Sequence, residues 1–247
     1  MSLRLRYLYR AYRYRYRVDP AEIRFMGERL RRGDLAVDVG AFKGAYTYWM
    51  RRFVGRGGQV IAFEPQPGQA AYIRKVIAAM KYTNVTLEAM GVSDAVGKLQ
   101  MFVPASGHEA TFESRKADEQ ACQTVDVPVT TLDTYFANKA AGPAFLKIDV
   151  EGHESAVLAG ARETLARFRP TILVECEARH RADGDVRPVF EFLASLDYEG
   201  SFFHAQQRRP LSEFSFDQHQ RRRPDGKLPP DYVNNFAFEP ANRSATV

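Results

Sequence analysis

The chain has 247 residues, of which 45% are hydrophobic and 26% charged, so it is long enough for one large α/β domain with a full core and too short for two ordinary ones. Its formal net charge of +5 is modest, and much of the excess lies in RLRYLYRAYRYRYR and QHQRRR, so charge characterises these two segments and not the whole fold. The two cysteines, Cys122 and Cys176, have no CxxC spacing and indicate neither a disulfide framework nor a thiolate zinc site.

The N-terminal segment is basic and aromatic. MSLRLRYLYR is not followed by the apolar core of a signal peptide, and no stretch of about 18 apolar residues occurs, so we expect a cytoplasmic protein without a transmembrane segment. Arginine and tyrosine alternate in YLYRAYRYRYR, which in an extended strand would place rings and guanidinium groups on opposite faces. The segment could pack on its own domain or on a second subunit of a homo-oligomer, contact an acidic substrate or carrier, lie on an anionic membrane, or bind nucleic acid. We favour packing and expect no nucleic-acid partner, because no base-reading module occurs elsewhere in the chain.

Helix and strand patterns alternate after this segment. Asp19-Pro20 caps a helix over AEIRFMGERLRR, so residues 1–33 form a basic arm and an N-terminal helix, and residues 34–247 form the main domain. Buried strands are predicted at LAVDV, QVIAFEP, NVTLEAM, PAFLKIDV, TILVECE and YVNNFAFEP, and helices lie between most of them. LQMFVP and TVDVPV are added strands around a variable insertion near residues 104–123, and a loop or lid is expected near residues 205–231. This order predicts an α/β fold with a mostly parallel sheet and helices on both faces.

In such a sheet the ligand lies at the carboxyl ends of the strands. The first strand is followed by a turn with Gly40 and Gly44, where residues without Cβ allow close backbone approach to a ligand. The GxxxG spacing differs from the dinucleotide motif, and Lys43 is not followed by the Ser or Thr of a P-loop. Glu64 ends the second strand, where a carboxylate can accept both hydroxyls of a ribose, although an ordinary turn with an exposed Glu is the alternative.

The segment FLKIDVEGHE contains the main catalytic candidates. Asp149 ends a central strand, where it could take the proton of an alcohol or bind a cofactor ammonium group. Glu175 ends the neighbouring strand, and with Asp149 and His180 it could hold a divalent cation such as Mg or Mn, which we favour because this edge carries more carboxylates than one proton transfer needs. Glu151 and His153 are further catalytic candidates, and the alternative is that they form the charged rim of a loop.

A series of motifs resembles a known family. DVGAFKG, FEPQP, VPVTTLDTYF, LKIDVEGHESAVLAGARETL and the closing NNFAF resemble, in this order, motifs of the FkbM family of S-adenosylmethionine-dependent methyltransferases. The resemblance covers roughly residues 36–177, with a weaker similarity at 232–240. It implies the class I methyltransferase (Rossmann-like) fold, whose sheet has seven strands with the last one antiparallel, and methyl transfer to a hydroxyl oxygen.

The resemblance also implies S-adenosyl-L-methionine as the cofactor. Its expected binding residues are Asp38 and Gly40 for the methionine portion, Ala41, Phe42 and Gly44 in the turn, Glu64 with Pro65 for the ribose, Met90 and Val92 beside the adenine, and Asp149. Phe42 stands where family members commonly have Asn. We therefore expect an O-methyltransferase acting on a small-molecule or glycan acceptor, through a hydroxyl of a sugar, glycolipid or secondary metabolite. The alternatives are a nucleic-acid methyltransferase that uses the basic arm and a non-catalytic nucleotide-binding or scaffold protein.

Overall fold

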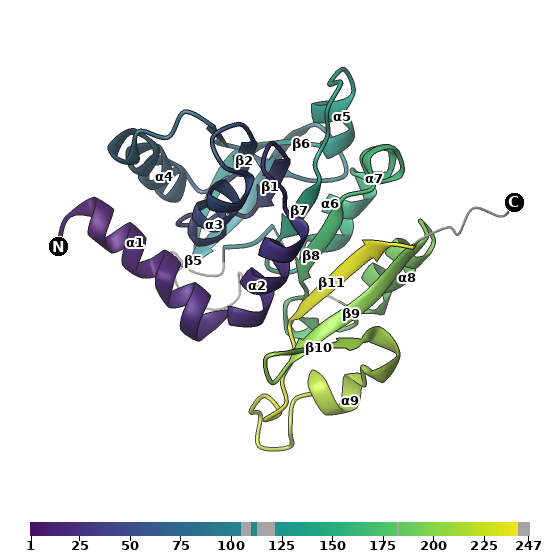
Figure 1. Cartoon of the computed structure of the whole chain (residues 1–247). Coiled ribbons are helices and arrows are strands. Elements are labelled where there is room, and N and C mark those ends of the chain that lie inside the picture. Colours follow the sequence, from purple (N-terminus) through teal and green to yellow (C-terminus); the bar gives the residue numbers. More distant parts are fainter. Residues whose placement is uncertain (105–109, 113–121, 182, 242–247) are drawn as a thin grey trace, which may run out of the picture.

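A mixed sheet forms the centre of the molecule. The computed structural model describes residues 1–104, 110–112, 122–181 and 183–241. Its main sheet has eight strands in the order β10-β9-β11-β8-β7-β1-β2-β3 (Figure 1). The strands are β1 (Leu35–Val39), β2 (Gln59–Phe63), β3 (Val85–Glu88), β7 (Phe145–Ile148), β8 (Thr171–Glu175), β9 (Tyr198–His204), β10 (Gln207–Pro210) and β11 (Asn235–Pro240). The run from β3 to β8 is parallel, and β11 is antiparallel to both of its neighbours. The predicted α/β sheet with an antiparallel last strand is confirmed.

The number of strands differs from the prediction of seven. The additional strand is β10, which pairs antiparallel with β9 at the edge of the sheet. Ala205 and Gln206 connect the two strands with φ values of 47° and 65°, a backbone typical of tight hairpin turns. The segment near 205–231, expected to be a loop or lid, therefore contains β10, and it also contains the short helices η4 (Leu211–Glu213) and α9 (Phe216–His219).

A small second sheet carries the insertion. Its strands are β4 (Gly91–Val92), β5 (Gly97–Pro104) and β6 (Cys122–Thr130), in the order β4-β6-β5. The strands predicted on either side of the insertion are thus confirmed as the antiparallel pair β5 and β6. Residues 105–109 and 113–121 of the insertion lie outside the described residues.

Helices cover both faces of the main sheet (Figure 1). They are α2 (Pro20–Arg29), α3 (Ala45–Val54), α4 (Pro67–Met80), α5 (Leu132–Phe136), α6 (Glu154–Ala159), α7 (Arg162–Phe168) and α8 (Arg187–Ala194). Successive side chains of a strand point to opposite faces of the sheet, so one hydrophobic core lies on each face. Val37 packs on the side of α5 to α8, whereas its neighbour Ala36 packs on the side of α2 and α3. No helix in the described part of the chain is long and apolar enough to cross a membrane.

The N-terminal segment is helical rather than extended. It forms α1 (Leu3–Arg13), followed by a π-helical turn η1 (Tyr14–Val18), and α1 packs against α3 and α4. Tyr7 and Ala11 are four residues apart, lie on the same face and are completely buried. The indole N–H of Trp49 donates a hydrogen bond to the Ala11 carbonyl at 2.8 Å. The segment therefore packs on its own domain, and it does so as a helix.

Candidate active site

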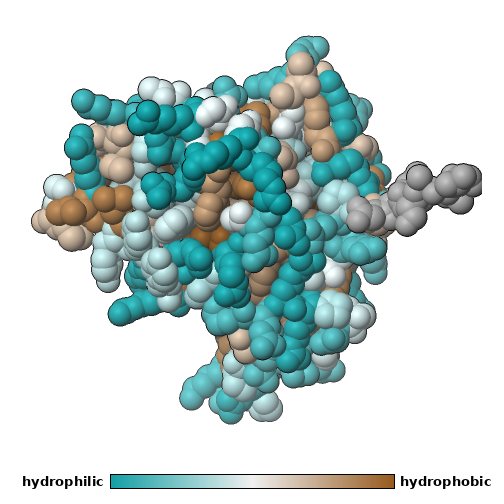
Figure 2. Space-filling model, in the orientation of Figure 1, coloured by the Kyte–Doolittle hydropathy of each residue, from teal (hydrophilic) through white to brown (hydrophobic). Residues whose placement is uncertain are grey.

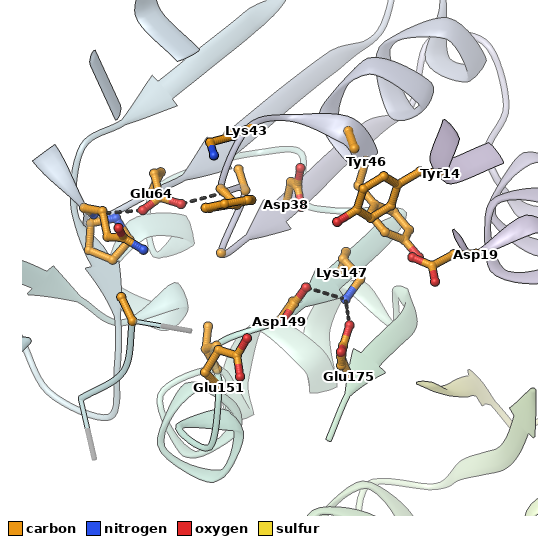
Figure 3. Close-up of a pocket in the computed structure, with 18 of the residues that line it drawn as sticks. Tyr14, Asp19, Asp38, Lys43, Tyr46, Glu64, Lys147, Asp149, Glu151 and Glu175 are labelled. Carbon is orange, nitrogen blue, oxygen red and sulfur yellow. Dashed lines mark hydrogen bonds and ion pairs between the residues drawn. The ribbon is translucent and has the colours of Figure 1, made fainter. Parts of the chain in front are cut away.

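A pocket of about 330 Å³ lies at the carboxyl edge of the sheet (Figure 3). It is formed by the turn after β1, the end of β2, the ends of β7 and β8, and the N-terminal segment. The structure brings together in its lining these predicted residues: Asp38, Gly40, Ala41, Phe42, Glu64, Pro65, Asp149, Glu151 and Glu175. Glu64 lies at one side of the pocket, and Asp149 and Glu175 lie at the other (Figure 3).

A buried lysine stands between the two catalytic candidates. Lys147 lies in β7 with 1% of its side chain exposed, and its Nζ is 3.5 Å from Asp149 Oδ2 and 3.9 Å from Glu175 Oε2 (Figure 3). The side chain of Asp149 is 33% exposed and lines the pocket. The ammonium group also lies 5.0 Å from the centre of the Tyr46 ring, which is a favourable position for a cation. The lysine therefore holds a positive charge directly behind the carboxylates.

The pKa values of this group are shifted by burial and by charge. Burial raises the pKa of Asp149 and of Glu175, and the Lys147 ammonium opposes this rise in both cases. Burial alone would lower the pKa of Lys147, but the surrounding carboxylates, Asp149 first among them, outweigh it and the net pKa shift is upward. The lysine therefore stays charged. A carboxylate with a raised pKa is a stronger base, so Asp149 is suited to accept a proton from an alcohol.

Glu64 shapes the opposite side of the pocket. Its carboxylate accepts the backbone N–H of Phe42 at 2.6 Å and that of Gln66 at 2.8 Å. The residue is 3% exposed, and burial raises its pKa to about 8 although both N–H groups favour the ionised form. Phe42 itself has a φ of 49°, a left-handed backbone that Asn adopts more readily than Phe. A carboxylate oxygen can accept more than one hydrogen bond, so Glu64 can also receive hydroxyl groups of a ligand.

The two glycines of the first turn serve the packing of the protein itself. A Cβ on Gly40 would lie 1.8 Å from the carbonyl oxygen of Asp149, so glycine lets the turn after β1 lie against the end of β7. A Cβ on Gly44 would lie 3.3 Å from the Tyr7 ring, where α1 packs. Both residues have positive φ, of 82° and 74°. Gly40 thus lets the backbone of two strand ends lie together and Gly44 makes room for a side chain of α1, and Gly40 also lines the pocket.

The N-terminal segment contributes residues that the sequence analysis did not place in the site. Arg10, Tyr14, Val18 and Asp19 all line the pocket. Asp19 accepts a hydrogen bond from the Tyr46 hydroxyl at 2.9 Å. The sequence predicted the start of a helix at Asp19-Pro20. It did not indicate that this helix start lies at the carboxyl edge of the sheet.

Some predicted site residues lie outside the pocket lining. Gly44 contacts the arm, Val92 is buried in the core, and Met90 packs against that core. The His153 Nε2 lies 2.9 Å from the Ser93 hydroxyl, and its ring contacts Phe112. His180 is buried with its Nδ1 2.6 Å from Glu151 Oε2, so it reaches the site only through Glu151.

The predicted cation site does not fit the geometry. The ring of His180 faces Glu151 rather than the space between Asp149 and Glu175, and the ammonium group of Lys147 lies beside those two carboxylates. Within the described residues, no group of three or more His, Cys, Asp or Glu side chains is arranged to hold a metal ion. The predicted ligands Asp149, Glu175 and His180 therefore do not converge on one point in this structure, and Lys147 lies beside the two carboxylates.

Comparison with known proteins identifies the family. The sequence model described as "Methyltransferase FkbM domain" matches residues 38–199, well over half of the chain. The chain belongs to the FkbM methyltransferase family. No curated protein matches the sequence significantly.

Solved structures of methyltransferases share the fold. The FkbM methyltransferase from Methylobacillus flagellatus KT aligns with 96% of this chain and 55% of its own, at 17% identity and a TM-score of 0.53. The chain described here therefore covers little more than half the length of the Methylobacillus protein. An O-methyltransferase from Bacillus cereus in complex with SAH aligns over 96% and 90% of the two chains, at 14% identity and a TM-score of 0.52. A putative rRNA-methylase from Clostridium thermocellum aligns over 89% and 93%, at 13% identity and a TM-score of 0.54. These similarities show the class I methyltransferase fold.

Proposed function

We propose that this methyltransferase transfers the methyl group of S-adenosylmethionine to a hydroxyl oxygen of a polyhydroxylated acceptor, such as a sugar, a glycolipid or a hydroxylated secondary metabolite. The observation that carries the proposal is the carboxylate pair Asp149 and Glu175, held beside the pocket by Lys147. Family membership supports methyl transfer, and a carboxylate base is what an alcohol acceptor requires.

The side of the pocket near β1 and β2 fits the cofactor. Glu64 offers carboxylate oxygens at the end of β2, where a ribose would be received. Asp38 lies near the end of β1, next to the turn, and its carboxyl group can receive the ammonium group of the methionine portion. Burial raises the pKa of Asp38 to about 6. S-Adenosylmethionine, when bound, supplies a methyl group that is attached to a positively charged sulfur and is open to attack. The pocket residues on this side therefore bind and orient the cofactor.

The other side of the pocket performs the acid–base chemistry. A bound S-adenosylmethionine would give its methyl group to the acceptor oxygen and leave as the neutral thioether, so the acceptor hydroxyl has to lose its proton. The acceptor proton passes to a carboxylate oxygen of Asp149. Lys147 keeps its positive charge next to this carboxylate throughout. A positioned base of this kind contributes on the order of 10² to 10⁴ to the rate.

Polar side chains beside the base suit a polyhydroxylated acceptor. The Asn234 side chain lines the pocket and donates to Glu175 Oε1 at 2.7 Å, which orients that carboxylate. Tyr14 and Asp19 from the N-terminal segment lie on the same side (Figure 3). Carboxylate, phenol and amide groups together can hold several hydroxyls at once and leave one of them at Asp149.

A transfer assay tests the proposal. The protein is incubated with S-adenosylmethionine labelled in the methyl group and with a panel of free sugars, glycolipids and hydroxylated small molecules, and the products are analysed by mass spectrometry. We expect a labelled methyl ether on a hydroxyl-bearing acceptor, and its absence with the Asp149→Asn variant. Label on a nitrogen or carbon atom, or transfer that is equally fast in the variant, would contradict the proposal.

A further inference from the structure

The solvent side of the N-terminal segment carries an unusual row of side chains. Large hydrophobic side chains that are strongly exposed occur, within the described residues, almost only in residues 1–18, and Val96 is the exception. The members in this segment are Met1 (75% exposed), Leu5 (57%), Tyr9 (61%), Tyr12 (43%), Tyr16 (66%) and Val18 (39%). Figure 2 shows hydrophobic side chains protruding where the N-terminal end of α1 lies in Figure 1.

These side chains form one continuous stripe. Leu5, Tyr9, Tyr12 and Tyr16, called here the apolar stripe, follow one another at intervals of four, three and four residues, which places them on one face of a helix. The opposite face carries Tyr7, which is buried against the domain. Because α1 and η1 run without interruption from Leu3 to Val18, the stripe from Leu5 to Tyr16 extends along roughly 17 Å at the usual rise of a helix.

Arginines accompany the stripe. Arg6, Arg13 and Arg17 are exposed and follow each other at helical spacing along one side of it, and Arg4 is exposed as well. Residues 1–18 contain no aspartate or glutamate. The face therefore combines exposed apolar and aromatic side chains with positive charges only.

We propose that this face of α1 and η1 is a docking surface for an anionic lipid bilayer. An interfacial helix inserts aliphatic and aromatic side chains at the level of the headgroups, while arginines beside them pair with lipid phosphates. Leu5, Met1 and Val18 would remain in water against nucleic acid, which offers stacking partners for the tyrosines but no apolar layer. A second copy docked symmetrically through the same face would bring the arginine rows together without acidic partners, which is unfavourable.

The docking segment is also part of the active-site pocket. Arg10, Tyr14 and Val18 line the pocket, and Tyr9 and Tyr16 lie within two residues of them on the exposed side. Binding to a bilayer would thus bring the site close to the lipid headgroups. If the proposed function holds, this closeness narrows the acceptor to a hydroxyl group on a lipid-linked glycan or on a lipid headgroup.

Vesicle sedimentation tests the docking surface without any assay of methyl transfer. The purified chain is mixed with vesicles of phosphatidylcholine alone, or of phosphatidylcholine with phosphatidylglycerol, and the bound fraction is measured. We expect binding to the mixed vesicles only, with weakening at high salt. The triple variant Leu5→Ser, Tyr9→Ser and Tyr16→Ser, and the triple variant Arg6→Gln, Arg13→Gln and Arg17→Gln, should each lose about tenfold or more in affinity.

Matched controls separate this surface from general charge. Arg56→Gln, Arg74→Gln and Lys75→Gln remove the same three charges from exposed positions elsewhere, and Val96→Ser removes the other exposed apolar side chain; these variants should bind as the wild type does. All the substituted residues of both triple variants are exposed, and circular dichroism checks that α1 persists.

Absence of wild-type binding to anionic vesicles would overturn the proposal. So would a dimer that the stripe variant dissolves, or binding to RNA alone that the arginine variant abolishes, since each assigns the face to a different partner. Vesicle binding without methyl transfer would leave the docking surface standing and count against the proposed function.

Discussion

Lys147 Nζ lies 3.5 Å from Asp149 Oδ2, and Asp149 directly follows the last residue of β7, two positions after the lysine. The lysine is buried inside the protein, whereas the carboxylate reaches the pocket. One end of β7 therefore carries both a fixed positive charge and an accessible base. Lys147 thus supplies a positive charge at the edge of the sheet where the number of carboxylates predicts a divalent cation.

Lys147→Met should lower the stability of the protein by about 3 kcal/mol or more, because it leaves Asp149 and Glu175 close together without a cation. The loss should be larger at high pH. Both carboxylates have raised pKa values in the folded protein, and without the lysine these rise further, so the folded state is disfavoured once the unfolded chain can release those protons. Thermal unfolding of the wild type, Lys147→Met and the control Lys43→Met across pH measures this. Equal unfolding temperatures of the wild type and Lys147→Met would contradict it.

Glu64→Gln should make stability less dependent on pH. Burial raises the pKa of Glu64 from an ordinary 4.5 to about 8, so between these values the unfolded state releases a proton that the folded state keeps. Stability contributed by the protonated group is thus fully present below the lower value and is lost as pH rises through the upper one, at up to about 1.4 kcal/mol per pH unit. Denaturant unfolding of both proteins without cofactor, from acidic to mildly basic pH, checks the slope. A Gln variant with an unchanged slope would refute this account of Glu64.

Much of the fold could be predicted from the sequence because the parallel strands are short buried runs between turn residues. LAVDV corresponds to β1 at its observed bounds, TILVECE begins with β8 and runs two residues past its end at Glu175, and the alternating helices predicted a parallel sheet. β9 and β10 could not be predicted in this way, because YEGSFFH contains a glycine and QRRP is polar and fully exposed. Their pairing depends on the turn at Ala205 and on docking against β11, which are tertiary effects.

The site was predictable in part for a similar reason. Asp149 and Glu175 end buried strands, so their place at the ligand edge follows from the topology. The sequence analysis did not assign Lys147 to the site. A lysine inside the apolar run FLKI nevertheless predicts nearby carboxylates, because a buried lysine requires acidic partners. The pocket residues of the N-terminal segment were not predictable, because the alternation of Arg and Tyr gives no information on where a helix at the start of the chain will dock.

Glu64→Ala should weaken the binding of S-adenosylmethionine and of its demethylated product by about tenfold or more, because it removes the carboxyl oxygens that receive the ribose and also the anchor of the turn at Phe42. Isothermal titration calorimetry measures the affinities. Glu88→Ala is the matched control, since Glu88 ends the neighbouring strand β3 and does not line the pocket. Equal affinities of the wild type and Glu64→Ala would remove Glu64 from the cofactor site.

Removal of divalent cations should leave methyl transfer unchanged. The positive charge beside Asp149 and Glu175 comes from Lys147, so the base requires no metal to be held in place. Turnover is compared before and after treatment with a chelator and again after magnesium or manganese is added back. Activity that disappears with the chelator and returns with the metal would show that a cation acts at this site.

The most direct test compares turnover of the wild type, Asp149→Asn and Glu154→Gln on an acceptor found by the transfer assay, with cofactor affinity measured on the same samples. Asp149→Asn keeps the shape of the side chain and removes the base, so turnover should fall on the order of 10² to 10⁴ while the cofactor still binds. Glu154 is buried, its pKa is raised by burial to about 7, and its role is to accept the Gly152 N–H, which glutamine can also do. Glu154→Gln should therefore retain most of the activity. Wild-type turnover by Asp149→Asn, with the cofactor bound normally, would contradict the assignment of Asp149 as the proton acceptor.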